Sequence, residues 1–258
     1  MTVRVESLGL EKRVGRKVPG VRLGQREFEI LVFLLEMKMA SLDQVYRKFF
    51  WSEASKSERY AYTRLKLLKD HGFVATQKVY TEPQEYFFAT DKAYRISRNF
   101  YPSEEVSKAL SSIDLRYFEH DKRVVDCCIA LERSWGIRDW ISERKLKGSF
   151  LRACPERLKS LLTAAFIPDA IFSMKEGTKV AFELEHARKV RERYEEKIHR
   201  FRLLMEERDP MLFSRTLFVA TSQPVFQVLQ DLTEAHGDLF KVIFYPDLCS
   251  PKPKEIGV

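Results

Sequence analysis

The sequence predicts an α+β protein of two domains, in which a helical domain closed by a β-hairpin precedes a larger domain of mixed helices and strands. Three observations support this prediction. Apolar residues recur at helical spacing and then alternate as in strands, in each half of the chain. The 258 residues are 45% hydrophobic and 32% charged, which is a globular composition. Positive charge is concentrated in the first part of the chain, which indicates a separate role for that part.

The charge is unevenly distributed. Residues 1–100 hold 19 Lys and Arg against 12 Asp and Glu, whereas the remaining residues hold 26 against 25. An excess of this kind predicts that the first domain meets a polyanion. Residues 1–26 alone carry seven basic side chains and two glutamates. We assign residues 1–24 to a basic arm, which is either a solvated segment or a contact to phosphate.

Several function classes are disfavoured by what the sequence lacks. Its longest apolar run, Ile30–Leu35, is too short to span a bilayer, and its first residues lack the apolar core of a secretory signal. The four cysteines show no CxxC spacing, which argues against a zinc knuckle or a disulfide framework. No Gly-rich phosphate loop is found, which disfavours ATP-driven activity. We therefore expect a reduced, cytoplasmic protein that does not contact membranes.

Residues 25–100 are predicted to form the first domain, beginning with three helices. Apolar spacing predicts a helix over residues 25–38. Ser41 is expected to cap a short second helix, and Ser55 or Ser57 a third that ends at Gly72.

A β-hairpin is expected after the third helix. Residues 73–80 and 86–89 have strand-like content and are separated by the turn 81–84, and Thr90-Asp91 is then expected to cap another helix. Three helices followed by a hairpin are typical of a winged helix-turn-helix, whose third helix lies in the major groove of duplex DNA. The same fold also occurs as a protein-contact module, and this alternative stays open.

The third helix carries polar and basic residues on the face turned away from its apolar side. These residue types contact phosphates and base edges. The candidate DNA-binding residues are Lys56, Arg59, Tyr62, Thr63, Arg64 and Lys66. Gln77, Lys78 and Glu82, near the hairpin tip, are expected to reach the neighbouring backbone.

Residues 101–114 show no strong pattern and are interpreted as a linker, which leaves residues 115–258 as the second domain. This domain is expected to begin with a helix that ends at Gly136, followed by a strand over residues 137–142. The segments that follow are expected to be strands 166–174 and 179–185, helix 189–207, strand 215–221, helix 224–235 and strand 240–245.

Three carboxylates are expected to converge in this domain. Glu183 and Glu185 face the same side of one strand, because side chains alternate, and the hairpin brings Asp169 towards them. Such a group repels itself unless a cation lies among its members, and its hard oxygen ligands suit Mg²⁺ or Mn²⁺. A metal held there can activate water against a phosphodiester. The alternative is that these are solvated carboxylates at strand ends.

The pattern resembles the PD-(D/E)XK nuclease superfamily. Pro168-Asp169 followed, after thirteen residues, by Glu183-Leu184-Glu185 is similar to its motif, and the order of elements agrees with a restriction-endonuclease-like domain. The resemblance implies catalytic roles for Asp169, Glu183, Glu185 and, as an additional acid, Glu143. Glu185 departs from the pattern because a lysine is expected there. Lys189 or Lys197 on the next helix would then supply the missing cation, with Lys189 favoured by its proximity in the sequence.

More narrowly, residues 25–207 resemble the replication-relaxation family of plasmids and integrative elements. The residues that carry this resemblance are Arg59-Tyr60, Leu65-Lys66-Leu67-Leu68, Gly72-Phe73-Val74, Trp140-Ile141-Ser142-Glu143, Ile167-Pro168-Asp169, Ala181-Phe182-Glu183-Leu184-Glu185, Lys189 and Arg193-Tyr194. The resemblance implies work on mobile-element DNA, in its replication, mobilisation or processing. Double-stranded DNA is the expected partner. Further candidates are a second copy of the chain, as a homodimer, and the element's replication or mobilisation proteins.

Three functions remain open at this point. The first is a metal-dependent DNA endonuclease targeted by its winged helix. The second is a non-catalytic DNA-binding factor that keeps the nuclease fold as a docking module. The third is a transcription regulator of the element's own genes.

Overall fold

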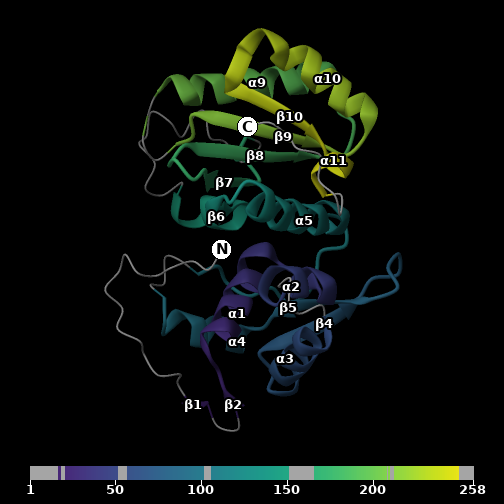
Figure 1. Cartoon of the computed structure of the whole chain (residues 1–258), viewed down its shortest axis with the longest axis vertical. Coiled ribbons are helices and arrows are strands. Elements are labelled where there is room, and N and C mark those ends of the chain that lie inside the picture. Colours follow the sequence, from purple (N-terminus) through teal and green to yellow (C-terminus); the bar gives the residue numbers. More distant parts are fainter. Residues whose placement is uncertain are drawn as a thin grey trace. The chain divides into compact units, whose positions relative to one another are not determined.

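The computed structural model describes residues 17–18, 21–51, 57–101, 106–150, 166–207, 209 and 212–249 (Figure 1). The fold is mixed α+β, as predicted. Contacts divide the chain into an amino-terminal unit, residues 2–125, and a carboxy-terminal unit, residues 126–258. The division falls inside helix α5 (Phe118–Ser134). Within the described ranges, no helix combines the length and the apolar character needed to cross a membrane.

The amino-terminal unit has helices alternating with short strands. In chain order they are β1 (Lys17–Val18), β2 (Val21–Arg22), α1 (Gln25–Met37), β3 (Ala40–Ser41), α2 (Leu42–Phe49), α3 (Arg59–Asp70), β4 (Val74–Lys78), β5 (Glu85–Ala89) and α4 (Asp91–Arg98). Strands β3, β5 and β4 form an antiparallel sheet in that order, and β1 pairs with β2. The predicted helices and hairpin are confirmed. Strand β3, whose two residues pair with the hairpin, was not predicted.

Local signals explain where these helices begin and end. The hydroxyl of Ser41 accepts a hydrogen bond from the backbone N–H of Gln44, whose side chain in turn accepts one from the N–H of Ser41. The predicted cap of α2 is therefore confirmed. Helix α3 begins after Glu58 without a side-chain cap, so a cap at Ser57 is wrong, and Ser55 lies outside the described residues. Gly72 follows α3 with a φ of 69°, which explains why a glycine ends this helix.

Part of the predicted linker packs against the hairpin of the same unit. Val106 and Ile113 are buried. The N–H of Ile113 donates to Oε1 of Gln77 at 2.9 Å, and Nε2 of Gln77 donates to the carbonyl of Ile113 at 3.4 Å. This stretch therefore belongs structurally to the amino-terminal unit.

The carboxy-terminal unit is built on a five-stranded mixed sheet in the order β10-β9-β8-β7-β6. Strands β6, β7 and β8 are antiparallel neighbours, whereas β8, β9 and β10 run parallel. After α5 the elements are β6 (Arg138–Ser142), α6 (Glu143–Lys145), a π-helical turn η2 (Leu146–Phe150), β7 (Ala170–Ser173), β8 (Lys179–Glu185), α9 (Arg191–Glu206), β9 (Arg215–Ala220), α10 (Gln223–Thr233), a 3-10 turn η3 (Glu234–Leu239), β10 (Phe240–Phe244) and α11 (Tyr245–Cys249).

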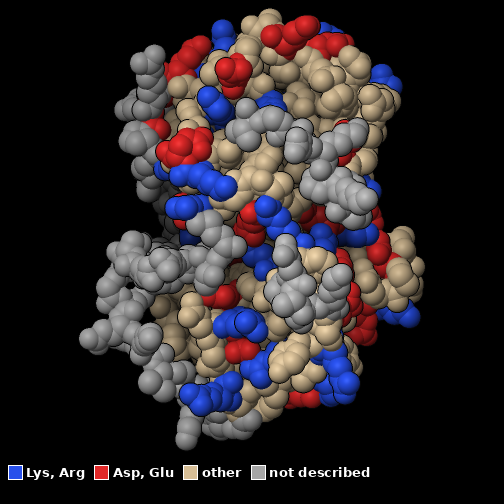
Figure 2. Space-filling view, in the orientation of Figure 1, with Lys and Arg blue, Asp and Glu red and all other residues tan. Residues whose placement is uncertain are grey.

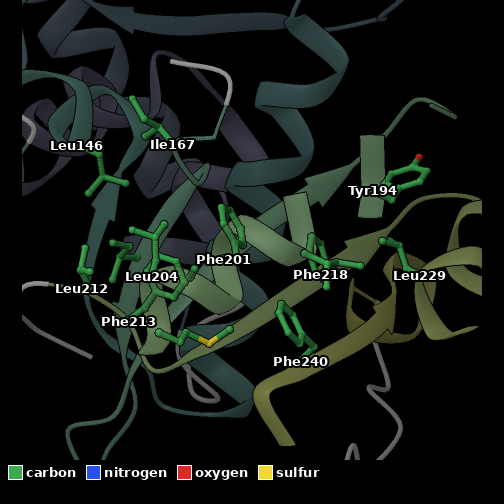
Figure 3. Packing of buried hydrophobic residues seen from close by; sticks show 14 of the residues in the cluster. Leu146, Ile167, Tyr194, Phe201, Leu204, Leu212, Phe213, Phe218, Leu229 and Phe240 are labelled. Carbon is green, nitrogen blue, oxygen red and sulfur yellow. The ribbon is translucent and has the colours of Figure 1, made fainter. Parts of the chain in front are cut away.

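Helices α9 and α10 cover one face of this sheet. Ile171, Ala181 and Phe218 of the strands belong to a buried cluster with Phe201 of α9 and Leu229 of α10. Figure 3 shows Phe201, Phe218 and Leu229 within this cluster. Because side chains alternate along a strand, Glu183 and Glu185 share this face with Ala181. The sheet therefore presents two glutamates to the inner side of α9.

The opposite sheet face carries aromatic side chains. The Trp140 ring is stacked with that of Phe172 at a centroid distance of 6.0 Å and lies 5.1 Å from that of Phe182. Each face of β7 and β8 is therefore packed, and their register is fixed from both sides. Gly177, with a φ of 94°, allows the tight turn that joins these two strands.

Candidate functional site

The two glutamates of β8 are deeply buried. The side chain of Glu183 is 5% exposed and that of Glu185 is 1% exposed. Carboxylates rarely occupy such positions without partners. The interpretation of these two residues as solvated strand-end carboxylates is therefore wrong.

Lys197 of α9 supplies the partner for both glutamates. Its Nζ lies 2.7 Å from Oε2 of Glu183 and 3.0 Å from Oε1 of Glu185. Its side chain is only 12% exposed, so this ammonium is also taken out of water. Lys197 therefore bridges the two carboxylates within the buried layer between α9 and the sheet.

Lys189 contacts the same group from its outer side. Its Nζ lies 2.6 Å from Oε2 of Glu185, and its side chain is 37% exposed. Sequence proximity favoured Lys189 over Lys197 as the missing cation. The structure brings both lysines to the site, but Lys197 contacts two of the carboxylates and is the more buried. The available signal was helical spacing, because Lys197 follows Tyr194 by three residues and precedes Phe201 by four.

Asp169 lies at the edge of this group and has a backbone role. Its Oδ2 accepts a hydrogen bond from the N–H of Leu184 at 2.8 Å. Strand β7 begins one residue later, at Ala170, so the side chain of Asp169 extends the β7–β8 ladder beyond the first residue of β7. Asp169 thus satisfies a backbone donor beside the two glutamates.

Glu143 is adjacent to Asp169 through the backbone. The N–H of Glu143 donates to the carbonyl of Asp169 at 2.8 Å. The carboxylate of Glu143 forms an ion pair with Lys147, one helical turn further along the chain. The structure therefore places the backbone of Glu143 beside that of Asp169, while the Glu143 carboxylate pairs with Lys147.

The burial of this group changes its proton affinities. Desolvation raises the pKa of Glu183 to about 8, with the charges of Asp169 and Glu185 adding to the rise and that of Lys197 opposing it. Burial disfavours the charged form of Lys197, but the charges of Glu183, Glu185 and Asp169 outweigh it and hold the pKa of Lys197 above its ordinary value. Asp169 thus acts electrostatically on both buried partners. We call these five residues, Asp169, Glu183, Glu185, Lys189 and Lys197, the acidic cluster.

The acidic cluster does not fit a resident divalent cation in this arrangement. Its oxygen donors are of the type that Mg²⁺ and Mn²⁺ prefer. However, the ammonium of Lys197 already bonds an oxygen of each buried glutamate. Over the described ranges, no group of three or more His, Cys, Asp or Glu side chains is disposed to hold a metal. The expected Mg²⁺ or Mn²⁺ therefore stays a prediction, and the two lysines offset part of the cluster's negative charge.

The surface of the carboxy-terminal unit mixes both signs of charge. Figure 2 shows Lys and Arg side chains interspersed with Asp and Glu on the face in view. Along α9, Arg191 and Arg200 each form an ion pair with a glutamate one turn away. This pattern is unlike the charge excess of residues 1–100.

The candidate DNA interface in the amino-terminal unit is the outer face of α3. Ala61, Leu65 and Leu68 are buried and fix which side of the helix faces inward. The predicted residues on the exposed side are Arg59, Tyr62, Thr63 and Lys66. The Thr63 hydroxyl donates to the carbonyl of Arg59 at 2.8 Å, and Lys66 pairs with Asp70 at 2.9 Å. Lys56 lies outside the described residues.

Arg64 has a different environment from the other predicted residues. Its Nε and Nη2 lie 2.7 and 2.6 Å from Oε1 of Glu27, a buried residue of α1. Oε2 of Glu27 accepts a hydrogen bond from the N–H of Gly24 at 2.8 Å. Arg64 is therefore a partly buried tie between α3 and the beginning of α1, with 31% of its side chain exposed.

Two of the three residues predicted at the hairpin tip are engaged within the unit. Gln77 bonds the backbone of Ile113, as described above, and Glu82 pairs with Lys122. Lys78 is exposed, as expected. Tyr80 is 98% exposed and was not among the predicted contact residues at the hairpin tip. The sequence feature that could have identified it is an aromatic residue beside a turn.

Comparison of the chain with protein-family models, with curated proteins and with solved structures finds no match. The resemblance to the replication-relaxation family therefore stays a prediction, and the case for a function depends on geometry and charge.

Proposed function

We propose that the chain binds duplex DNA through its amino-terminal unit, as a winged helix-turn-helix factor of a plasmid or other mobile element. One observation carries the proposal. Elements α1, β3, α2, α3, β4 and β5 follow one another as in a winged helix, and their strands pair in the order β3-β5-β4. In such an arrangement the third helix is the one that enters the major groove.

The side chains of α3 divide into two groups under this proposal. Arg59, Tyr62, Thr63 and Lys66 are exposed and suit contacts to base edges and phosphates. Arg64 is a positioning residue, because its ion pair with Glu27 fixes α3 against α1. The excess of positive charge in residues 1–100 supports an anionic partner.

We propose further that the carboxy-terminal unit is a PD-(D/E)XK-like domain. Its support is the series α5, β6, β7, β8, α9, β9, in which three antiparallel strands are followed by a parallel one. The alternative of a non-catalytic docking module is favoured by Lys197, which bonds both buried glutamates. A metal-dependent nuclease is the second candidate, and the shared sheet face of Glu183 and Glu185 beside Asp169 favours it.

Duplex binding is tested by fluorescence anisotropy at several salt concentrations. Arg59→Ala should weaken binding by about 1–3 kcal/mol if the arginine contacts a base edge. Lys66→Ala should lower the slope of log affinity against log salt by about one, as for a lost phosphate contact. Arg95→Ala is the control, because it removes an exposed, ion-paired charge from α4 instead of α3. Unchanged affinity and slope in both α3 variants would reject α3 as the reading element.

The second candidate is tested by a separate cleavage assay. Purified protein is incubated with Mg²⁺ or Mn²⁺ on plasmid and branched DNA, beside the Asp169→Asn variant. We expect no metal-dependent product from the wild type. Cleavage that requires metal and is lost in the variant would establish the nuclease and reject the docking module.

A further inference from the structure

The acidic cluster contains its own cation. Lys197 Nζ sits 2.7 and 3.0 Å from oxygens of two glutamates that project from alternate positions of β8. Both glutamates are at most 5% exposed, and Lys197 is 12% exposed. Such a compact, strongly localised charge is suited to bridging two carboxylates as a point cation. Lys197 therefore lies between the two carboxylates and bonds one oxygen of each.

A divalent cation and this ammonium would compete for the same oxygens. Mg²⁺ binds carboxylate oxygens at about 2.1 Å, so an ion on Oε2 of Glu183 would lie within about 5 Å of Lys197 Nζ. Two positive ions at that separation repel strongly in a buried site. Occupancy by metal therefore requires the ammonium to leave.

The other charged groups of the acidic cluster also disfavour a bound divalent cation. Lys189 bonds Oε2 of Glu185, so each oxygen of that carboxylate has an ammonium partner. Asp169 Oδ2 is bonded to the N–H of Leu184. Even with all three carboxylates ionised, the two ammonium groups leave a single negative charge, too little to attract a divalent cation strongly.

We propose that Lys197 is the built-in counter-ion of this site, in place of a divalent metal, and that removing its ammonium converts the acidic cluster into a Mg²⁺- or Mn²⁺-binding site. Without Lys197, ionisation of Asp169, Glu183 and Glu185 would leave three negative charges with one ammonium at the outer side. Hard cations are the natural replacement for the lost charge. This inference does not depend on DNA binding by the amino-terminal unit.

The test is thermal unfolding of wild type and variants, with and without Mg²⁺ or Mn²⁺. The wild type should show no shift in melting temperature with either metal. Lys197→Gln should gain about 5 °C or more at saturating metal, because a ligand that binds only the folded state stabilises it. Lys189→Gln is the matched control, since it removes the outer ammonium and leaves Lys197 in place. It should gain no such shift.

Isothermal titration with Mn²⁺ gives a second readout. Lys197→Gln should bind one ion, and the double variant Lys197→Gln, Glu183→Gln should lose that binding. If Lys197→Gln is unfolded without metal, folding on addition of Mn²⁺ supports the proposal. If this variant does not fold with Mn²⁺ either, the wild-type melt with and without metal is the deciding measurement. A wild type stabilised or titrated by either metal, or a folded Lys197→Gln protein that binds none, would overturn the proposal. Neither result bears on duplex binding, which is measured separately.

Discussion

Replacing Glu183 with glutamine should change how the stability of the carboxy-terminal unit depends on pH. The folded-state pKa of Glu183 is raised from 4.5 to about 8, mainly by burial. The folded state therefore binds this proton more tightly than the unfolded state does. The contribution to stability is fully present below about pH 4.5, declines as pH rises to about 8, and is constant above that.

The magnitude follows from the shift. Each unit of pKa difference corresponds to 1.36 kcal/mol, so this group contributes at most about 5 kcal/mol across the window. Coupling to Lys197 and Glu185 spreads part of the titration over the cluster, so a few kcal/mol is expected. Glutamine does not titrate and still offers an oxygen to the Lys197 ammonium. Relative to wild type, Glu183→Gln should therefore become more stable by this amount between pH 5 and pH 8.

Urea unfolding at pH 5, 6.5 and 8 measures the difference. Tryptophan fluorescence reports on the carboxy-terminal unit in a Trp51→Phe background, because the two remaining tryptophans, Trp135 and Trp140, both lie in that unit. Glu176→Gln, in the exposed turn before β8, is the control and should leave the pH profile unchanged. A Glu183→Gln profile parallel to that of the wild type would refute the reasoning.

Three further predictions concern stability and are measured by urea unfolding. Asp169→Ala should cost about 1–3 kcal/mol because the backbone donor at the end of the β7–β8 ladder loses its acceptor, whereas Asp169→Asn retains an oxygen and should cost less; equal losses would argue against this hydrogen bond. Arg64→Ala should lower the free energy of unfolding by about 1–3 kcal/mol, because it leaves buried Glu27 without this arginine. Lys66→Ala, which removes a member of an exposed ion pair, should lower it by at most about 0.5 kcal/mol. The reverse order would contradict the assignment of Arg64 as a positioning residue. Ser41→Ala should cost about 1 kcal/mol through loss of the α2 cap, with Ser41→Thr as the conservative control; equal stability of all three proteins would mean that the cap contributes nothing.

The secondary structure was largely readable because local signals agreed with tertiary packing. Strand β8 has the predicted bounds, 179–185, since its alternation and the preceding Gly177 turn act together. Ser41 marked the beginning of α2 through its capping box. Strand β3 was missed because two residues give no periodicity, and its existence depends on pairing with β5 more than 40 residues away.

The site was less predictable, because partners come from distant parts of the sequence. Alternation correctly put Glu183 and Glu185 on one side of β8. Helical spacing put Lys197 on the apolar side of the predicted helix, but only the packing of α9 on the sheet shows that its ammonium is buried against both glutamates. Arg64 was grouped with exposed residues because Glu27, its partner, is 37 residues away. Buried ion pairs between distant parts of the sequence can be identified only when the tertiary packing of the helices and strands is known.

Hydrogen–deuterium exchange with and without duplex DNA tests the proposed function most directly. We predict that duplex slows exchange in α3, residues 59–70, and that the protection is weakened in Arg59→Ala at equal DNA concentration. The control segment is α9, residues 191–206, where no change is expected. Duplex binding that protects other segments while α3 exchanges as in the free protein would contradict the proposal.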